Sequence, residues 1–250
     1  MSEINLIHGD CLEKMRSIPD NSIDLCLTDP PYGTTACKWD SVIPFEPMWE
    51  QLKRIVKDNG AICLFGSEPF SSALRMSNIK MFKYDWVWDK VRPVGAHVAK
   101  HRPMQLTEII SVFGISRLNY YPQMVSRANP RKGGKEYGRT EIVGGKINAL
   151  KNKDKVYTHK NPTNLIVESN ASNNGRVHPT QKPVALLEYL IKTYTLEGDA
   201  VLDFTAGSFS TGVASINLNR NFIGIEKDKG YFDIGKVRIK EAKENKKNEV

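Results

Sequence analysis

Cysteine is scarce in this chain of 250 residues, and its few cysteines show no paired spacing. A zinc site would need cysteines or histidines in close pairs, so the cysteine pattern argues against one. Two of the cysteines lie in apolar runs typical of buried strands, and we therefore expect reduced thiols and a cytoplasmic protein. The cysteines are Cys11, Cys26, Cys37 and Cys63.

Long hydrophobic runs are missing as well. No apolar stretch reaches the length that crosses a bilayer, and no N-terminal segment resembles a signal peptide. The glycine-containing turn near residue 207 also lacks the G-x-G-x-x-G pattern of dinucleotide-binding units. These absences argue against membrane and secreted proteins and against a nicotinamide-dependent dehydrogenase.

Acidic residues are outnumbered by basic ones, 28 to 36, which gives a formal net charge of +8. A basic balance favours a polyanionic partner, although it does not identify that partner by itself. Ten lysines and arginines fall between residues 127 and 160, against three acids. An earlier basic patch, which could serve the same partner or be a solvated face, consists of Lys90, Arg92, Lys100, His101 and Arg102.

The basic region around residues 127–160 is rich in glycine and asparagine and has little apolar periodicity. It is too long for an ordinary connection inside a compact domain. One interpretation is a disordered basic linker. The other is an insertion that contacts DNA phosphates and base edges. The basic count alone favours neither.

Apolar runs and helical stripes alternate along the rest of the chain. This alternation predicts an α/β fold with a mostly parallel sheet and helices on both faces. We expect a catalytic domain formed by residues 1–114 and 177–250, interrupted by a basic insertion at 115–176. Strands are predicted at 4–7, 23–28, 61–65, 84–88, 108–113, 200–204 and 221–226, and helices from near Leu12 and at 45–57, 69–77, 184–194, from 213 and at 228–245.

The tetrapeptide Asp29-Pro30-Pro31-Tyr32 directly follows the predicted strand at 23–28. Ligands of open α/β sheets bind at the carboxyl ends of strands. A carboxylate from Asp29 and a carbonyl from Pro30 could accept both hydrogens of an exocyclic amino group, and Tyr32 offers a flat face for an extruded base. The alternative is a strand-ending turn with a solvated carboxylate.

A nucleoside-binding unit is predicted near the carboxyl end. The strand at 200–204 runs into a turn of small residues at 205–212, a helix follows, and the next strand ends on Glu226. Such a turn lets a ligand approach the backbone, and a terminal acid can accept ribose hydroxyls. Near the amino end, Asp10 could cap the helix that starts near Leu12 or could bind a ligand.

Together these segments resemble the β class of S-adenosylmethionine-dependent DNA amino-methyltransferases. In that class the Asp-Pro-Pro-Tyr motif precedes the target-recognition region, and the cofactor motif comes last. Here His178-Pro179-Thr180-Gln181-Lys182-Pro183 lies between them, and the resemblance covers nearly the whole chain outside 115–176. It implies a Rossmann-like sheet with one reversed strand, and it makes the insertion a target-recognition region for double-stranded DNA.

The resemblance also implies roles for single residues. The catalytic, base-binding set would be Asp29, Pro30, Pro31 and Tyr32. Asp10 and Cys11 would contact the adenine of the cofactor, Glu226 its ribose, and the turn at 203–207 its methionine. The full cofactor-binding set would be Asp10, Cys11, Asp29, His178, Thr180, Lys182, Asp203, Phe204, Thr205, Ala206, Gly207 and Glu226, with no metal ligand.

The resemblance implies methyl transfer from S-adenosylmethionine to adenine N6, since Asp at the first motif position leans towards adenine and Ser towards cytosine N4. Cytosine N4, RNA and a protein glutamine amide are the alternative acceptors. One departure keeps a rival from a different class open, a DNA-binding protein with an impaired cofactor site. Phe209 stands where the family usually has a second glycine. Its ring could lie away from the ligand and pack on the sheet, or its bulk could weaken cofactor binding. A monomer and a homodimer both remain open.

Overall fold

The computed structural model describes residues 2–34, 40–133, 155–170 and 181–248. It divides the chain into two compact units. The first comprises residues 1–121 and 164–250, and the second comprises residues 122–163. Within the described residues, no helix is long and apolar enough to cross a membrane.

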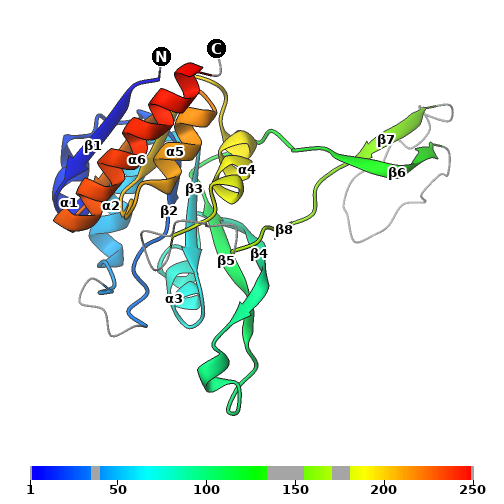
Figure 1. The fold of residues 1–250 in the computed structure, drawn as a ribbon, viewed down its shortest axis with the longest axis horizontal. Coiled ribbons are helices and arrows are strands. Elements are labelled where there is room, and N and C mark those ends of the chain that lie inside the picture. The colour runs from blue at the N-terminus through cyan, green and yellow to red at the C-terminus, as the bar shows by residue number, and fades with distance from the viewer. Residues whose placement is uncertain (1, 35–39, 134–154, 171–180, 249–250) are drawn as a thin grey trace. The chain divides into compact units, whose positions relative to one another are not determined.

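The first unit contains a sheet of eight strands in the order β1-β10-β9-β2-β3-β5-β4-β8 (Figure 1). All neighbouring pairs are parallel except those of β5, which runs antiparallel to both β3 and β4. The strands are β1 (Ile4–His8), β2 (Ile23–Thr28), β3 (Val56–Gly66), β4 (Phe82–Val94), β5 (Gln105–Phe113), β8 (Leu165–Val167), β9 (Ala200–Asp203) and β10 (Asn221–Glu226). The sheet thus has one reversed strand.

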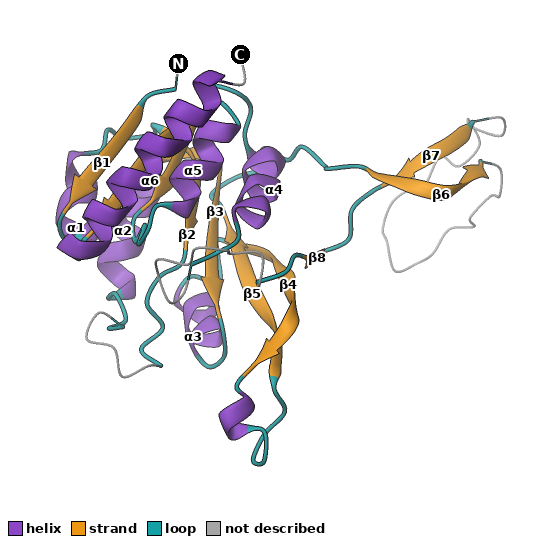
Figure 2. Cartoon of the chain, viewed as in Figure 1, coloured by secondary structure: helices purple, strands orange, loops and turns teal. Residues whose placement is uncertain are grey.

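Helices cover both faces of this sheet (Figure 2). From Leu25 onward the buried side chains of β2 alternate, with Leu25 and Leu27 in the core cluster of α4, α5 and α6, and Cys26 in that of α1, α2 and α3. Ile23 also lies in the second cluster, because the strand is irregular between Ile23 and Leu25. The helices are α1 (Cys11–Lys14), α2 (Phe45–Ile55), α3 (Phe70–Ser77), α4 (Val184–Tyr194), α5 (Ser210–Asn217) and α6 (Lys229–Asn248), with short 3-10 turns η1 (Met15–Ser17) and η2 (Ala96–Val98). The predicted α/β class with helices on both faces is confirmed.

Some predicted boundaries are wrong. The helix predicted to continue to Lys57 ends at Ile55, because Val56 already pairs with Ile23 of β2 and begins β3. Its β-branched side chain suits the pleated sheet better than a helix. β4 continues to Val94, well past the predicted end at residue 88, and β8 was not predicted at all.

The second unit is built on a two-stranded antiparallel sheet of β6 (Val125–Lys132) and β7 (Val156–Lys160). Arg127 Nε donates to the carbonyl of His159 at 3.1 Å, which ties the two strands together. Lys155 Nζ lies 5.6 Å from the centroid of the Tyr157 ring. The predicted insertion at 115–176 includes this unit, and its role in target recognition stays a prediction.

Candidate active site

A cavity of about 790 Å³ lies in the first unit, at the edge of the sheet where the parallel strands end. The segments that follow β1, β2, β9 and β10 supply much of its wall. His178 and Thr180 fall outside the described residues. Every other predicted site residue lines this one cavity: Asp10, Cys11, Asp29, Pro30, Pro31, Tyr32, Lys182, Asp203, Phe204, Thr205, Ala206, Gly207 and Glu226.

The local sequence explains why the Asp-Pro-Pro-Tyr segment leaves the sheet here. β2 is buried along its whole length and ends at Thr28, after which two prolines cannot donate ladder hydrogen bonds. The turn after β9 holds the departing chain in place. Thr205 Oγ1 donates to the carbonyl of Asp29 at 3.0 Å, and the Phe204 amide donates to Thr28 Oγ1 at 3.2 Å. The two predicted motifs are therefore hydrogen-bonded to each other.

The Asp29 side chain belongs to a cluster of charged groups. Its Oδ1 accepts the Tyr32 hydroxyl at 2.5 Å, and its Oδ2 accepts Lys182 Nζ at 2.6 Å. Glu108 Oε1 lies 3.0 Å from Lys182 Nζ and 3.1 Å from the Tyr32 hydroxyl. Glu108 Oε2 lies 3.8 Å from Lys90 Nζ. Two carboxylates, two ammonium groups and one tyrosine hydroxyl thus form a single cluster.

Burial and pairing act against each other on the pKa values of this cluster. Burial raises the pKa of Asp29, the Lys182 ammonium opposes that rise, and the charge of Glu108 adds to it. Burial would lower the pKa of Lys182, but the two carboxylates raise it above its usual range. For Lys90 burial prevails, and its pKa is lowered. Burial and the two carboxylates raise the pKa of Tyr32, so this hydroxyl stays a neutral donor.

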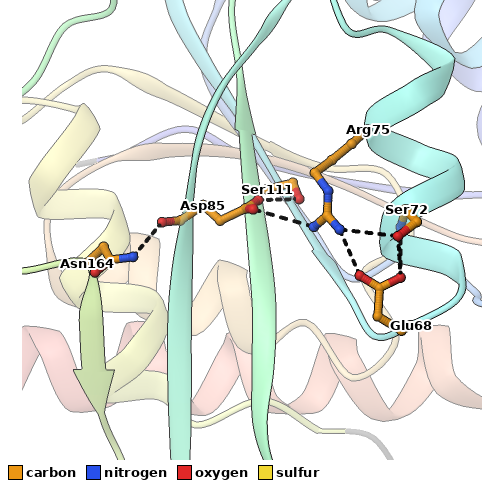
Figure 3. A network of polar contacts seen from close by, with 6 residues as sticks. All are labelled: Glu68, Ser72, Arg75, Asp85, Ser111 and Asn164. Atoms are coloured by element: carbon orange, nitrogen blue, oxygen red, sulfur yellow. Dashed lines mark hydrogen bonds and ion pairs between the residues drawn. The ribbon is translucent and has the colours of Figure 1, made fainter.

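The Tyr32 ring is supported by the first residue of α3. It stacks on Phe70 with 5.0 Å between centroids and 26° between planes. A polar network ties α3 to the sheet, with Arg75 donating to Glu68 at 2.7 Å and to Asp85 of β4 at 3.4 Å (Figure 3). Ser111 of β5 donates to the same Asp85 carboxylate at 2.7 Å. The network therefore fixes the helix on which the Tyr32 ring rests.

Two acids hold the turn after β9. Asp203 Oδ2 accepts the Thr211 hydroxyl at 2.6 Å and Oδ1 accepts the Thr205 amide at 3.3 Å, while burial raises its pKa to about 7. Glu226 accepts the amides of Gly207 and Asp228, both at 2.7 Å. Burial raises the pKa of Glu226 as well. Both carboxylates are thus fixed by the turn that they border.

Asp10 caps the helix α1 and also lines the cavity. Capping and ligand binding, which the sequence leaves as alternatives, are therefore compatible. Its Oδ1 accepts the Leu12 amide at 3.0 Å, so the capping interpretation is confirmed. Partial burial would raise its pKa, but the hydrogen bond from Lys227 at 3.1 Å and the Leu12 amide lower it. Next to it, burial raises the pKa of the Cys11 thiol to about 11, which keeps that sulfur neutral.

Phe209 adopts the left-handed backbone conformation, with φ at 58°, that a glycine would favour. Its side chain is fully buried and does not line the cavity. The ring packs edge-on against Phe222 and Phe232, with centroids 6.3 Å and 5.9 Å away. A Cβ on Gly235 would lie 1.9 Å from the ring, and one on Gly224 would lie 2.5 Å from it, so two glycines make room for it. The Phe209 ring therefore packs away from the cavity, and weakened cofactor binding stays a prediction.

Two members of the charged cluster, Glu108 and Lys90, are not among the predicted site residues. The sequence predicts Glu108 only as the first residue of the strand at 108–113, and Lys90 only as a member of the earlier basic patch. Because β5 is reversed, its first residues lie at the edge where β3 ends, with Ile109 opposite Gly66. The signal for Glu108 in the sequence is a single carboxylate directly before the apolar run at 109–113. In the described part of the chain, no group of three or more His, Cys, Asp or Glu residues could hold a metal ion.

The amino-acid sequence matches a family model described as DNA methylase over residues 23–237. Two curated relatives are similar over nearly the whole chain. The Type II methyltransferase M2.MboI of Moraxella bovis is 27% identical, with 98% of this chain and 90% of the relative covered. The DNA adenine methyltransferase YhdJ of Escherichia coli K12 is 30% identical, with 94% of this chain and 82% of the relative covered.

Solved structures show the same architecture. The M1.HpyAVI–SAM complex aligns with a TM-score of 0.63 at 26% identity, covering 94% of this chain and 98% of that one. The PvuII DNA methyltransferase, whose name gives it as cytosine-N4-specific, aligns with a TM-score of 0.66 at 17% identity, covering 99% and 94%. The second likeness concerns the fold alone.

Proposed function

Because the chain belongs to the N6/N4 DNA methylase family, we propose that it methylates adenine N6 within a specific sequence of double-stranded DNA. Methyl transfer to DNA from S-adenosylmethionine is the activity of the family. The choice of adenine is supported by Asp29 at the first motif position and by the similarity to YhdJ, named as a DNA adenine methyltransferase. The similarity to M2.MboI, named as a Type II methyltransferase, supports a role in restriction-modification.

The residues around the cavity fit S-adenosylmethionine. A volume of about 790 Å³ is ample for a nucleoside with an amino-acid arm. Glu226, held by the Gly207 and Asp228 amides, still has lone pairs for ribose hydroxyls. Asp10 and Cys11 would border the adenine, and Asp203 with its turn would border the methionine. When bound, the cofactor supplies a methyl group on a sulfonium that can be transferred directly.

Asp29 and Pro30 would prepare the acceptor base. The lone pair of an exocyclic amino nitrogen is delocalised into the ring, so the nitrogen is a poor nucleophile. Hydrogen bonds from its two hydrogens to the Asp29 carboxylate and the Pro30 carbonyl would localise that lone pair. As the N–C bond forms the nitrogen becomes cationic, and the Asp29 carboxylate would stabilise this charge before the proton leaves. A flipped base would stack on Tyr32, whose ring is supported by Phe70.

An enzyme-bound methyl intermediate is not needed for this reaction. Burial raises the pKa values of Cys11, Cys26 and Cys63, so none of these thiols is a ready nucleophile. All three are free and buried, which supports the expected cytoplasmic location. Positioning and charge stabilisation would therefore provide most of the catalysis.

The observation that carries the proposal is the hydrogen bond of 3.0 Å between Thr205 Oγ1 and the Asp29 carbonyl. It fastens the base-binding motif to the cofactor turn inside one cavity. The test is incubation of duplex DNA with labelled S-adenosylmethionine, digestion to nucleosides and mass spectrometry. We expect N6-methyldeoxyadenosine. Methylated cytosine would contradict the assignment of the base, and label found only in RNA or protein would contradict the assignment of DNA.

A further inference from the structure

Glu108 is a buried carboxylate that the methyl-transfer mechanism above leaves without a role. It lines the active-site cavity from β5, and only 12% of its side chain is exposed. A buried acid is costly unless it is paired, and Glu108 faces two ammonium groups and a phenol. Its position follows from the reversal of β5, which brings the start of this strand to the edge where Asp29 lies.

Glu108 shares its partners with Asp29. Lys182 Nζ lies 2.6 Å from Asp29 Oδ2 and 3.0 Å from Glu108 Oε1. The Tyr32 hydroxyl lies 2.5 Å from Asp29 Oδ1 and 3.1 Å from Glu108 Oε1. Both groups that occupy the Asp29 oxygens thus have a second acceptor within reach, and that acceptor is the same oxygen.

The charges explain why this second acceptor matters. Asp29, Glu108, Lys90 and Lys182 together are neutral when each carries its usual charge. Without Glu108 the site would carry one net positive charge, next to an amino nitrogen that becomes cationic during transfer. Lys182 would then be paired with Asp29 alone, and a carboxylate neutralised by a buried ammonium is a weaker acceptor.

We propose that Glu108 is a positioning residue for methyl transfer. It offers Lys182 and the Tyr32 hydroxyl a second acceptor, so that the Asp29 carboxylate can exchange them for hydrogens of the target amino group. This inference rests on the proposed function. Among the residues that the structure describes, the titratable groups that face the Asp29–Glu108 pair are Lys90 of β4, Lys182 ahead of α4, Tyr32 after β2 and Asp203 at the end of β9.

The first test is Glu108→Gln, which keeps an acceptor oxygen and a similar shape but removes the charge. At saturating cofactor we expect kcat to fall about 10- to 100-fold. The Kd of S-adenosylmethionine, measured by calorimetry, should change by less than about threefold. Loss of the Glu108 charge also lowers the pKa of Asp29, so the acid limb of the kcat–pH profile should move to lower pH.

A second variant separates charge from structure. Lys182→Met should move the acid limb to higher pH, because the ammonium that lowers the pKa of Asp29 is removed. The double variant Glu108→Gln/Lys182→Met lacks the excess positive charge, so its kcat should exceed that of Glu108→Gln alone. Glu108→Asp, which restores a carboxylate one methylene shorter, should recover part of the lost kcat. Glu46→Gln, an exposed substitution on α2 away from the cavity, serves as the matched control.

Three results would overturn the inference: an unchanged kcat in Glu108→Gln, losses that simply add in the double variant, or an acid limb that does not move. A purely structural role would lower the melting temperature and cofactor affinity together and leave the pH profile in place. The comparison is made on whichever acceptor the wild type methylates. Transfer to cytosine would therefore contradict the proposed function while still testing Glu108, and a wild type without any methyl transfer would contradict both.

Discussion

The Asp29 carboxylate lines the cavity and accepts hydrogen bonds from Tyr32 and Lys182, while its backbone carbonyl accepts one from Thr205 in the turn after β9. We predict that Asp29→Ala lowers kcat by about 10²-fold or more, because the charge that stabilises the developing cation is lost. The Kd of S-adenosylmethionine should stay within about threefold of the wild-type value. Label transfer to DNA and calorimetry give the two values. Asp20→Ala, an exposed surface control, should change neither, and full turnover in Asp29→Ala would refute its assignment.

Asp203 gives a prediction for the pH dependence of stability. Burial raises its pKa from 3.8 to about 7, so between these values the folded state binds more protons than the unfolded state. The free energy of unfolding contributed by this group therefore falls as pH rises from about 4 to 7, by at most about 1.4 kcal/mol per pH unit. Urea unfolding of cofactor-free protein across this range should show the fall.

Asp203→Asn keeps one acceptor oxygen for the Thr205 amide, and its NH2 group can donate to the Thr211 hydroxyl, but it cannot ionise. Relative to the wild type, the variant should therefore lose this part of the pH dependence. Asp29 and Glu226 also have raised pKa values and act in the same direction, so only the difference between the two proteins isolates Asp203. Parallel stability curves for the two proteins would show that Asp203 is ionised throughout.

At the level of helices and strands, the direction of each strand decides which site residues can be predicted from the sequence. Asp29, Asp203 and Glu226 each end or directly follow an apolar strand, so their position at the sheet edge could be read from the chain. An apolar run does not reveal whether its strand is parallel or reversed. Glu108 stands near the start of β5 and reaches the same edge only because β5 is antiparallel to β3. Lys90 could not be predicted either, because the alternating pattern ends at residue 88 whereas β4 continues to Val94.

The packing of α6 against the turn after β9 explains how the chain tolerates Phe209. Replacing a helical glycine by alanine usually stabilises a helix by about 1 kcal/mol. At Gly235 the new Cβ would lie 1.9 Å from the Phe209 ring, so Gly235→Ala should instead destabilise by about 1–3 kcal/mol. Gly230→Ala, at an exposed position of the same helix, is the matched control and should be close to neutral.

A second substitution tests whether the Phe209 ring is the group that a Cβ at residue 235 would contact. Phe209→Ala should cost about 3–5 kcal/mol by leaving a cavity, and in that background Gly235→Ala should become neutral or stabilising. Urea unfolding of the four proteins measures this coupling. The Kd of S-adenosylmethionine should change by less than about threefold in folded Phe209→Ala, because the ring points away from the cavity. A large change in that Kd would restore the idea that residue 209 controls cofactor binding.

At the scale of the whole molecule, the basic excess falls in the second compact unit, residues 122–163, but charge does not show the structure of that unit. The excess of basic residues between 127 and 160 left a linker and a DNA-binding insertion equally open. Pairing between β6 and β7 joins segments more than twenty residues apart, as in Lys132 opposite Val156, and local composition carries no signal for such pairing. The described part of this region is therefore built on two paired antiparallel strands, called the β6–β7 pair below.

The β6–β7 pair carries exposed lysines at residues 132, 155 and 160, on and beside its two strands. We predict that Lys132→Gln/Lys155→Gln/Lys160→Gln weakens binding to duplex DNA and makes log K less dependent on log salt, by about 0.9 for each lost phosphate contact. Lys240→Gln/Lys243→Gln/Lys247→Gln removes the same charge from exposed positions of α6. If net charge alone drives binding, the two triple variants should lose affinity equally. A smaller salt slope only in the triple variant of the β6–β7 pair would identify the second unit as a DNA-contacting surface, and an unchanged slope there would contradict that role.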